Sequence, residues 1–242
     1  MKNIGLIGCG NIAETYFRAQ EYFNNINFVA CADINLDAAK KTADQYNIIP
    51  LSVDEILNDK NVDIILNLTI PQAHYEISKR ALEANKHVYC EKPMSVKFDE
   101  AKELLNLAKK NSLYIGNAPD TFLGGGGQLT RNLIDNNDIG QVLTGNFIFA
   151  FPGVQDFHPS PESWFQEGGG PVIDMGPYFF TTLVNLLGPV KNIRGRGAKF
   201  SDKREYKAGP KKGETFNVEI PTSYMFNIAV SYTHLRAHET VV

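Results

Sequence analysis

The chain has 242 residues, of which 43% are hydrophobic and 21% charged, with a formal net charge of −3 at pH 7. This balance gives no reason to expect nucleic acid or an anionic membrane as a partner. Three scattered cysteines without a C-x-x-C pair argue against a structural zinc site and a disulfide framework. No apolar run reaches the ~18 residues of a membrane span, and the first strand leaves no room for a signal peptide. We therefore expect a cytoplasmic protein with two modest domains.

Strand and helix patterns alternate over the first half of the chain. The expected strands are 4–8, 27–33, 63–69, 87–91 and 113–117, and the expected helices are 11–23, 36–46, 71–85 and 98–111. Ser52 and Glu55 form a capping box ahead of a further short helix. The alternation predicts right-handed crossovers and a doubly wound parallel sheet of the Rossmann type, which we assign to residues 1–118.

After Ala118 the pattern changes. We expect a helix that follows the glycines at 124–127 and runs to about residue 136, a second helix at 172–187, a long loop rich in proline, glycine and aromatic residues between 152 and 170, and strands at 142–151, 190–200 and 214–229. These strands look antiparallel, so the second domain, residues 119–229, is predicted to be α+β with an open, mainly antiparallel sheet.

The last residues depart from the pattern of the rest of the chain. Residues 230–240 resemble the translation of a transposon-type sequencing adaptor. We expect residues 230–242 to be a non-native tail and the natural protein to continue beyond Ala229, which leaves the second sheet incomplete. A genuine terminal strand with a short polar tail is the alternative.

A glycine-rich turn, Gly8-x-Gly10-x-x-Ala13, follows the first strand and opens a helix. The first glycine permits the tight turn and the second lets the backbone approach a pyrophosphate. The small third residue keeps helix and strand close. The backbone N–H groups at the start of the helix, those of Asn11 and Ile12 among them, would face the anion. The alternative is a glycine-rich turn with no ligand.

Asp33 ends the second strand, where a carboxylate accepts hydrogen bonds from the ribose of a dinucleotide. The same carboxylate would repel a 2′-phosphate, and Ile34 and Asn35 supply no arginine to hold one. The sequence therefore favours NAD over NADP. A helix cap or turn residue is the alternative for Asp33.

The tripeptide Glu91-Lys92-Pro93 ends a strand in the second half of the predicted Rossmann domain. A lysine held there lies at the carboxyl edge of the parallel sheet, where open α/β folds bind their ligands. Taken alone, the tripeptide is more typical of a surface turn with a solvated lysine.

Four segments together resemble the Gfo/Idh/MocA oxidoreductase family over residues 2–229. The segments are Gly8 to Ala13, Thr69 to His74, Ala84 to Pro93 and Gly168 to Tyr178. The resemblance implies an N-terminal Rossmann domain and a C-terminal α/β domain built on a large open sheet. It also implies oxidation of a sugar or cyclitol hydroxyl, or reduction of the carbonyl, with NAD(P).

Carried over by position, the resemblance places Thr69, Pro71 and His74 along the nicotinamide half of the cofactor site. It places Glu91 and Lys92 beside the nicotinamide ribose and the reacting carbon, which makes Lys92 the strongest catalytic candidate. By itself, a histidine on an apolar helix such as His74 is more typical of a satisfied core residue.

The chain departs from the family at the segment Asp174 to Tyr178, where many relatives carry a histidine in place of Tyr178. A phenol exchanges a proton with a substrate hydroxyl if a nearby cation such as Lys92 lowers its pKa. Asp174, one helical turn earlier, would share the same face. The alternative for Tyr178 is a packed aromatic residue. In the loop ahead of this segment, His158 and Trp164 could contact a sugar ring or form the loop's own small core.

These residues predict an NAD-dependent dehydrogenase or reductase that acts on a sugar- or cyclitol-like alcohol. Lys92 would polarise the oxygen, Tyr178 would relay the proton and Asp174 would orient the array. Two alternatives keep the cofactor: an NAD-binding regulatory protein without turnover, and an NAD-dependent glycoside hydrolase. We expect no metal, and we expect the full-length protein to be a homo-oligomer.

Overall fold

The computed structural model describes residues 1–158 and 160–230. The chain divides into two compact units, Met1–Ala118 and Pro119–Val242. The first contains a six-stranded sheet, and the described residues of the second form two antiparallel strand pairs. The predicted fold class, a doubly wound parallel sheet followed by an α+β domain, is confirmed.

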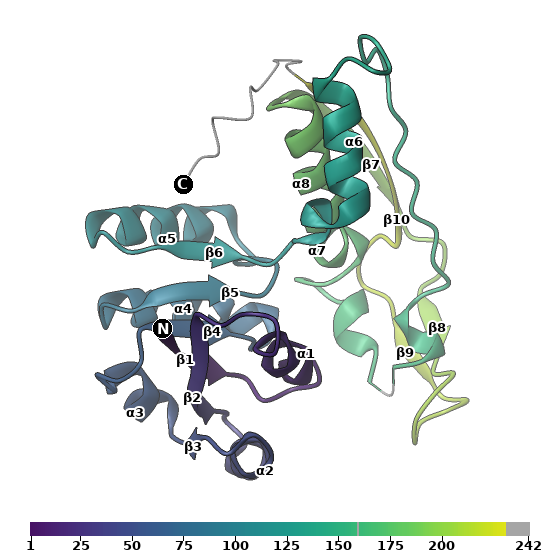
Figure 1. Ribbon diagram of the computed structural model, residues 1–242. Coiled ribbons are helices and arrows are strands. Elements are labelled where there is room, and N and C mark those ends of the chain that lie inside the picture. The colour runs from purple at the N-terminus through teal and green to yellow at the C-terminus, as the bar shows by residue number, and fades with distance from the viewer. Residues whose placement is uncertain (159, 231–242) are drawn as a thin grey trace. The chain divides into compact units, whose positions relative to one another are not determined.

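The sheet of the first unit is parallel throughout and has the strand order β3-β2-β1-β4-β5-β6 (Figure 1). Its strands are β1 (Lys2–Ile7), β2 (Ile26–Ala32), β3 (Ile49–Pro50), β4 (Ile64–Asn67), β5 (His87–Cys90) and β6 (Ile115–Asn117). The chain builds outward in one direction from β1 to β3 and in the other from β4 to β6. The loops that follow β1 and β4 therefore leave the sheet on opposite faces, which opens a crevice at their carboxyl ends.

Five α-helices connect these strands: α1 (Ala13–Ala19), α2 (Leu36–Tyr46), α3 (Val53–Asn58), α4 (Pro71–Glu83) and α5 (Phe98–Lys110). The predicted capping box begins α3, because the Ser52 amide donates to Glu55 Oε2 at 2.8 Å and the Glu55 amide donates to Ser52 Oγ at 3.2 Å. Helix α1 is shorter than predicted. The amides of Gln20 and Tyr22 donate to carbonyls three residues back, which tightens the turns after the helix.

Two buried clusters fill the two faces of the sheet. One gathers residues of α3, α4 and α5, among them Leu82 and Leu104, and the other gathers residues of α1 and α2 with β2. Successive strand residues alternate between the clusters, as Ile65 and Leu66 do, because side chains of a strand point to opposite faces. Full burial of each large aliphatic side chain stabilises the fold by about 1.5–3 kcal/mol, and the sheet is held from both sides.

The second unit contains helices α6 (Gly125–Asp135), α7 (Pro171–Asp174) and α8 (Gly176–Leu187), and short 3-10 helices η1 (Thr121–Leu123), η2 (Val154–Asp156) and η3 (Glu162–Phe165). Strand β7 (Val190–Ala198) pairs antiparallel with β10 (Ser223–Val230), and β8 (Lys203–Glu205) pairs antiparallel with β9 (Thr215–Asn217). Arg131 joins α6 to α8 by donating to the carbonyls of Asn185 and Leu186 at 2.7 and 3.0 Å.

Three predicted elements of the second unit differ from the structure. Among the described residues no strand pairs with the segment 142–151, and an apolar pattern becomes a strand only where a partner completes its hydrogen bonds. The helix predicted at 172–187 is interrupted at Met175, and α8 begins anew with Pro177 in its first turn, where a missing N–H is tolerated. The strand predicted at 214–229 is two strands, β9 and β10.

Two further sequence predictions concern the C-terminal tail and membrane-spanning helices. The predicted tail lies outside the described residues from position 231 onward. Within the part of the chain that the structure describes, no helix is both long and apolar enough to cross a membrane.

Candidate cofactor and catalytic site

The glycine turn after β1 is shaped by Gly8. Its φ of 103° lies in the left-handed region, and its amide donates to the carbonyl of Ala32 at 2.9 Å. A Cβ at this position would lie 2.6 Å from the carbonyl carbon of Leu68 and 2.8 Å from the amide nitrogen of Thr69. Only glycine therefore allows the turn to pack against the end of β4.

Gly10, two residues later, has a different setting. A Cβ built on it meets no protein atom within 4 Å, and Gly10, Asn11 and Ile12 are all exposed. Ala13 is buried and begins α1 against the sheet. The turn thus presents open backbone on its outer side and tight packing on its inner side, which is the arrangement that a pyrophosphate requires.

Asp33 connects the end of β2 to this turn. Its Oδ2 accepts from the amide of Cys9 at 2.7 Å, and its Oδ1 accepts from the amide of Asn35 at 2.7 Å. The Asn35 side chain in turn caps α2. Two carboxylate oxygens accept about four hydrogen bonds, so the side chain keeps capacity for ribose hydroxyls. The predicted turn role of Asp33 is thus present, and the turn residues together fit a dinucleotide.

The tripeptide Glu91-Lys92-Pro93 follows β5 and is held from several elements. The Glu91 amide donates to the carbonyl of Asn67 at 2.9 Å, and the Asn117 side chain donates to the Glu91 carbonyl at 2.9 Å. Glu91 Oε1 accepts from Tyr16 Oη at 2.7 Å, while Oε2 accepts from the Lys92 amide at 3.0 Å. The ends of β4 and β6, together with α1, therefore fix the backbone that carries Lys92.

His74 joins the loop after β4 to the loop after β5. Its Nδ1 lies 2.6 Å from the carbonyl oxygen of Pro93, and its Nε2 lies 2.9 Å from the carbonyl oxygen of Thr69. The ring is 1% exposed, which agrees with the alternative of a satisfied core histidine. Direct contact of His74 with a cofactor stays a prediction, as does that of Thr69 and of Pro71, the first residue of α4.

Asn67 is a buried residue of this site that the sequence analysis missed. It is 0% exposed, and its side-chain nitrogen donates to the His74 carbonyl and to Ser78 Oγ, each at 3.0 Å. Its Oδ1 accepts from the amide of Thr69 at 3.3 Å and from its hydroxyl at 2.7 Å. Tyr16 and Asn117 were missed as well. The sequence did contain a signal for two of these residues: Asn67 and Asn117 each end an otherwise apolar strand.

Burial shapes the electrostatics next to the tripeptide. Cys90, the last residue of β5, is fully buried, and this desolvation raises the pKa of its thiol to about 12. The thiol is therefore neutral near pH 7 and acts as a small apolar residue behind Glu91.

Asp174 and Tyr178 lie in the second unit and are half-buried. Asp174 ends α7, whereas Tyr178 stands in the first turn of α8, where its carbonyl accepts from Thr182 Oγ1 at 2.7 Å. The interruption at Met175 means that the two side chains are not on one continuous helix, contrary to the prediction. Their catalytic roles stay predictions.

His158 and Trp164 contact each other, with ring centroids 4.6 Å apart. Trp164 also packs against a small buried cluster, which we call the loop core, consisting of Phe165, Tyr206, Phe216 and Val218. This packing agrees with the alternative that the aromatic residues form the loop's own core. Contact with a sugar ring stays a prediction for both residues.

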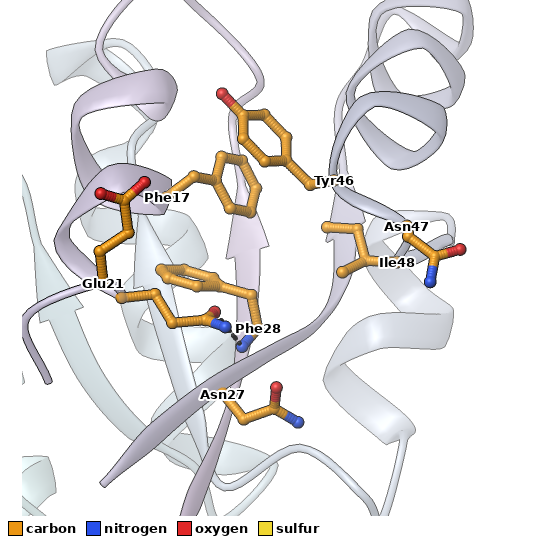
Figure 2. Close-up of a pocket in the computed structure, with 8 residues that line it drawn as sticks. Phe17, Glu21, Asn27, Phe28, Tyr46, Asn47 and Ile48 are labelled. Carbon is orange, nitrogen blue, oxygen red and sulfur yellow. Dashed lines mark hydrogen bonds between the residues drawn. The ribbon is translucent and has the colours of Figure 1, made fainter. Parts of the chain in front are cut away.

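A pocket of about 290 Å³ lies at the other end of the Rossmann sheet (Figure 2). Its walls are the start of β2, with Asn27 and Phe28, and the last turns of α1 and α2. Phe17 and Tyr46 stack within it at a centroid distance of 3.9 Å. The pocket contains none of the predicted site residues, and ligands of open α/β sheets bind at the carboxyl ends of the strands instead.

Comparison with known proteins agrees with this geometry. Residues 2–117 match the family model described as "Oxidoreductase family, NAD-binding Rossmann fold", and residues 128–235 match the one described as "GFO/IDH/MocA C-terminal domain". The first unit is therefore an NAD-binding Rossmann domain.

Individual relatives are distant. An uncharacterized oxidoreductase of Schizosaccharomyces pombe is 33% identical over 152 residues, which are 62% of this chain and 40% of that protein. Inositol 2-dehydrogenase of Salmonella typhimurium is 30% identical over 146 residues, 57% of this chain and 43% of that enzyme. The structure of levoglucosan dehydrogenase with NADH and L-sorbose matches with a TM-score of 0.80 at 21% identity. The match covers 95% of this chain and 64% of the levoglucosan dehydrogenase chain.

The chain thus spans less than two thirds of each of these proteins. The two family models nevertheless match nearly all of its residues, in the same order as the two structural units. The chain belongs to the Gfo/Idh/MocA family of oxidoreductases.

Proposed function

We propose that the protein is an NAD-dependent dehydrogenase or reductase that acts on an alcohol or carbonyl of a sugar- or cyclitol-like molecule. Residues 1–118 would bind the cofactor and residues 119–229 the substrate. The observation that carries the proposal is the fixed backbone of Glu91-Lys92-Pro93 at the carboxyl edge of the sheet, tied through Tyr16 to the helix that follows the glycine turn. The name of the inositol 2-dehydrogenase relative supports the substrate class.

The dinucleotide supplies a hydride acceptor or donor when bound. The exposed turn from Gly10 to Ile12 would hold its pyrophosphate, and Asp33 would accept from its ribose hydroxyls. Asn35, which uses its side chain to cap α2, and the exposed Ile34 provide no cation for a 2′-phosphate. These features support NAD over NADP.

Lys92 would donate a hydrogen bond from its ammonium group to the reacting oxygen of the substrate, which favours the developing negative charge on that oxygen. We propose that Tyr178 exchanges the proton with the same oxygen through its phenol and that Asp174 orients the substrate hydroxyls. The roles in the second unit rest on the matching positions in the family.

The test replaces Lys92 by methionine, which keeps the length of the side chain and removes its charge. The kcat of Lys92→Met should fall by about 10²- to 10⁴-fold, because one donor to the reacting oxygen is lost. The Kd for NADH, measured by fluorescence, should stay within about fivefold. The control is Lys97→Met, an exposed lysine whose Nζ lies 3.7 Å from Glu100 Oε1, and it should leave both quantities unchanged.

Equal turnover of Lys92→Met and the unsubstituted protein would exclude the assignment of Lys92. The same assay separates the alternatives. Tight NADH binding with no turnover of any polyol indicates a binding protein, and cleavage of a glycoside without accumulation of NADH indicates a hydrolase.

A further inference from the structure

The strands β4 and β5 stop pairing before they reach the residues that matter for catalysis. Their register ends at Asn67 opposite Cys90, and one more backbone bond joins the Glu91 amide to the Asn67 carbonyl. Beyond this point the two loops leave the sheet, and the ladder no longer sets the distance between Thr69 and Pro93. Some other contact has to set it.

The imidazole of His74 makes that contact. It reaches the carbonyl oxygens of Pro93 and Thr69 from its two ring nitrogens, at 2.6 and 2.9 Å. Carbonyl oxygens only accept, so a contact is a hydrogen bond only when the facing ring nitrogen carries a proton: the neutral ring donates to one of the two carbonyls, and the imidazolium donates to both. One rigid ring thereby spans the two loops that the family places along the nicotinamide.

The backbone of His74 is itself held by a buried polar residue. Asn67 donates to the backbone carbonyl of His74 and accepts from both the amide and the hydroxyl of Thr69. Asn67 is 0% exposed and His74 is 1% exposed. Hydrogen bonds in such a setting are strong, and an orphaned partner would be costly.

We propose that His74, anchored by Asn67, is a positioning residue that holds the Lys92 loop at a fixed distance from the Thr69 loop, a role that rests on the proposed hydride-transfer function. Lys92 precedes the clamped Pro93 directly, so movement of the Pro93 carbonyl moves the lysine. A misplacement of about 1 Å in a catalytic group lowers the rate by about 10²-fold.

The test compares two substitutions of His74 in the 242-residue chain. His74→Leu has similar volume and no donor, whereas His74→Gln keeps a side-chain N–H that can donate to one of the two carbonyl oxygens. His74→Leu should lower kcat by about 10²-fold with the Kd for NADH within about fivefold. His74→Gln should recover part of that loss. His87→Leu is the matched control. His87 begins β5, the strand that leads into Glu91-Lys92-Pro93, and its Nδ1 accepts from the Tyr114 amide at 3.1 Å.

A readout that needs no turnover is the deuterium exchange of the Glu91 and Lys92 amides, which donate to Asn67 and to the Glu91 side chain. Their exchange should rise about tenfold in His74→Leu and stay unchanged in His87→Leu. Equal exchange in the two variants overturns the proposal. Equal kcat in His74→Leu and His74→Gln, with both below the unsubstituted protein, overturns it as well.

The exchange measurement also distinguishes the two proposals. Faster exchange in His74→Leu, restored in His74→Gln, in a protein that turns over no polyol would support the clamp and contradict the enzymatic function. Turnover of a polyol by the unsubstituted protein, with unaltered amide exchange in His74→Leu, would support the enzymatic function and contradict the clamp. If His74→Leu does not fold, nitrogen-15 spectra of the unsubstituted protein decide. A slowly exchanging ring proton on His74, absent on the half-buried His87, supports the clamp, and its absence on both overturns it.

Discussion

Gly8 and Gly10 stand two residues apart, and the structure places different demands on them. Gly8 has a positive φ and lies against the backbone of Leu68 and Thr69. Gly10 has open space where a side chain would project. The first glycine therefore serves the fold of the turn, and we expect the second to serve the approach of a ligand to the backbone.

A matched pair of alanine substitutions separates these roles. Gly8→Ala should lower the free energy of unfolding by about 2–4 kcal/mol, because a strained φ and a backbone clash add. Gly10→Ala should leave stability within about 1 kcal/mol and weaken NADH binding at least about tenfold, since it blocks hydrogen bonds to a charged group. Urea unfolding and NADH fluorescence measure the two effects. Loss of NADH binding without loss of stability in Gly8→Ala would contradict this division.

At the scale of elements, the loop core joins η3 to the β8–β9 pair. Glu162 of η3 accepts from Tyr206 Oη, and Lys211 Nζ lies 3.0 Å from Glu162 Oε1. The hydrogen bond from Tyr206 lowers the pKa of Glu162 from its ordinary 4.5 to about 2, and hydrogen bonds from the backbone N–H of Glu162 itself and from Lys211 add to this effect. A lowered pKa means that the ionised carboxylate stabilises the folded loop core.

This stabilisation is complete above about pH 4.5 and is lost as the pH falls through about 2. Glu162→Gln should therefore destabilise the loop core by about 1 kcal/mol near pH 7, and the difference should shrink toward pH 2. Trp164, the single tryptophan of the chain, packs against the loop core and reports its unfolding by fluorescence. Urea titrations at pH 7, 4 and 2.5 give the comparison. A difference that does not change with pH would show that Glu162 does not stabilise the loop core through its charge.

At the scale of the whole molecule, the first unit contains everything that its fold requires. Both of its buried clusters draw on residues between Ile4 and Ile115. The glycine turn, Asp33 and the hydrogen bonds around Glu91 lie within residues 1–118 as well. We therefore expect folding and cofactor binding to be properties of this unit by itself.

Residues 1–118 expressed alone should consequently unfold in one cooperative transition and bind NADH with a Kd within about fivefold of that of the 242-residue chain. Limited proteolysis of the whole chain should leave a fragment close to these bounds. Circular dichroism, NADH fluorescence and mass spectrometry check the three outcomes. A fragment that is unfolded, or degradation of both units at one rate, would contradict the independence of the first unit.

Local patterns predicted much of this molecule. The alternation of strand and helix, the capping box at Ser52, the turn at Gly8 and the position of Lys92 at the end of a strand all follow from residues close together in the chain. Such features depend on short-range periodicity and on backbone preferences, which a sequence contains directly. The same patterns failed at 142–151, for which the described residues contain no partner strand, and at Met175, where a proline in the following turn decided the outcome.

The sequence by itself determined the Rossmann class, the glycine turn, the place of Asp33 as a candidate ribose ligand at the end of the second strand, and the candidate lysine. Only the tertiary structure decided that Tyr16, Asn67, His74 and Asn117 converge on the tripeptide Glu91-Lys92-Pro93. These residues lie far apart in the chain and belong to four different elements. The strand order brings them to one edge of the sheet, and that order follows from the packing of the whole domain around its core, which no local pattern contains.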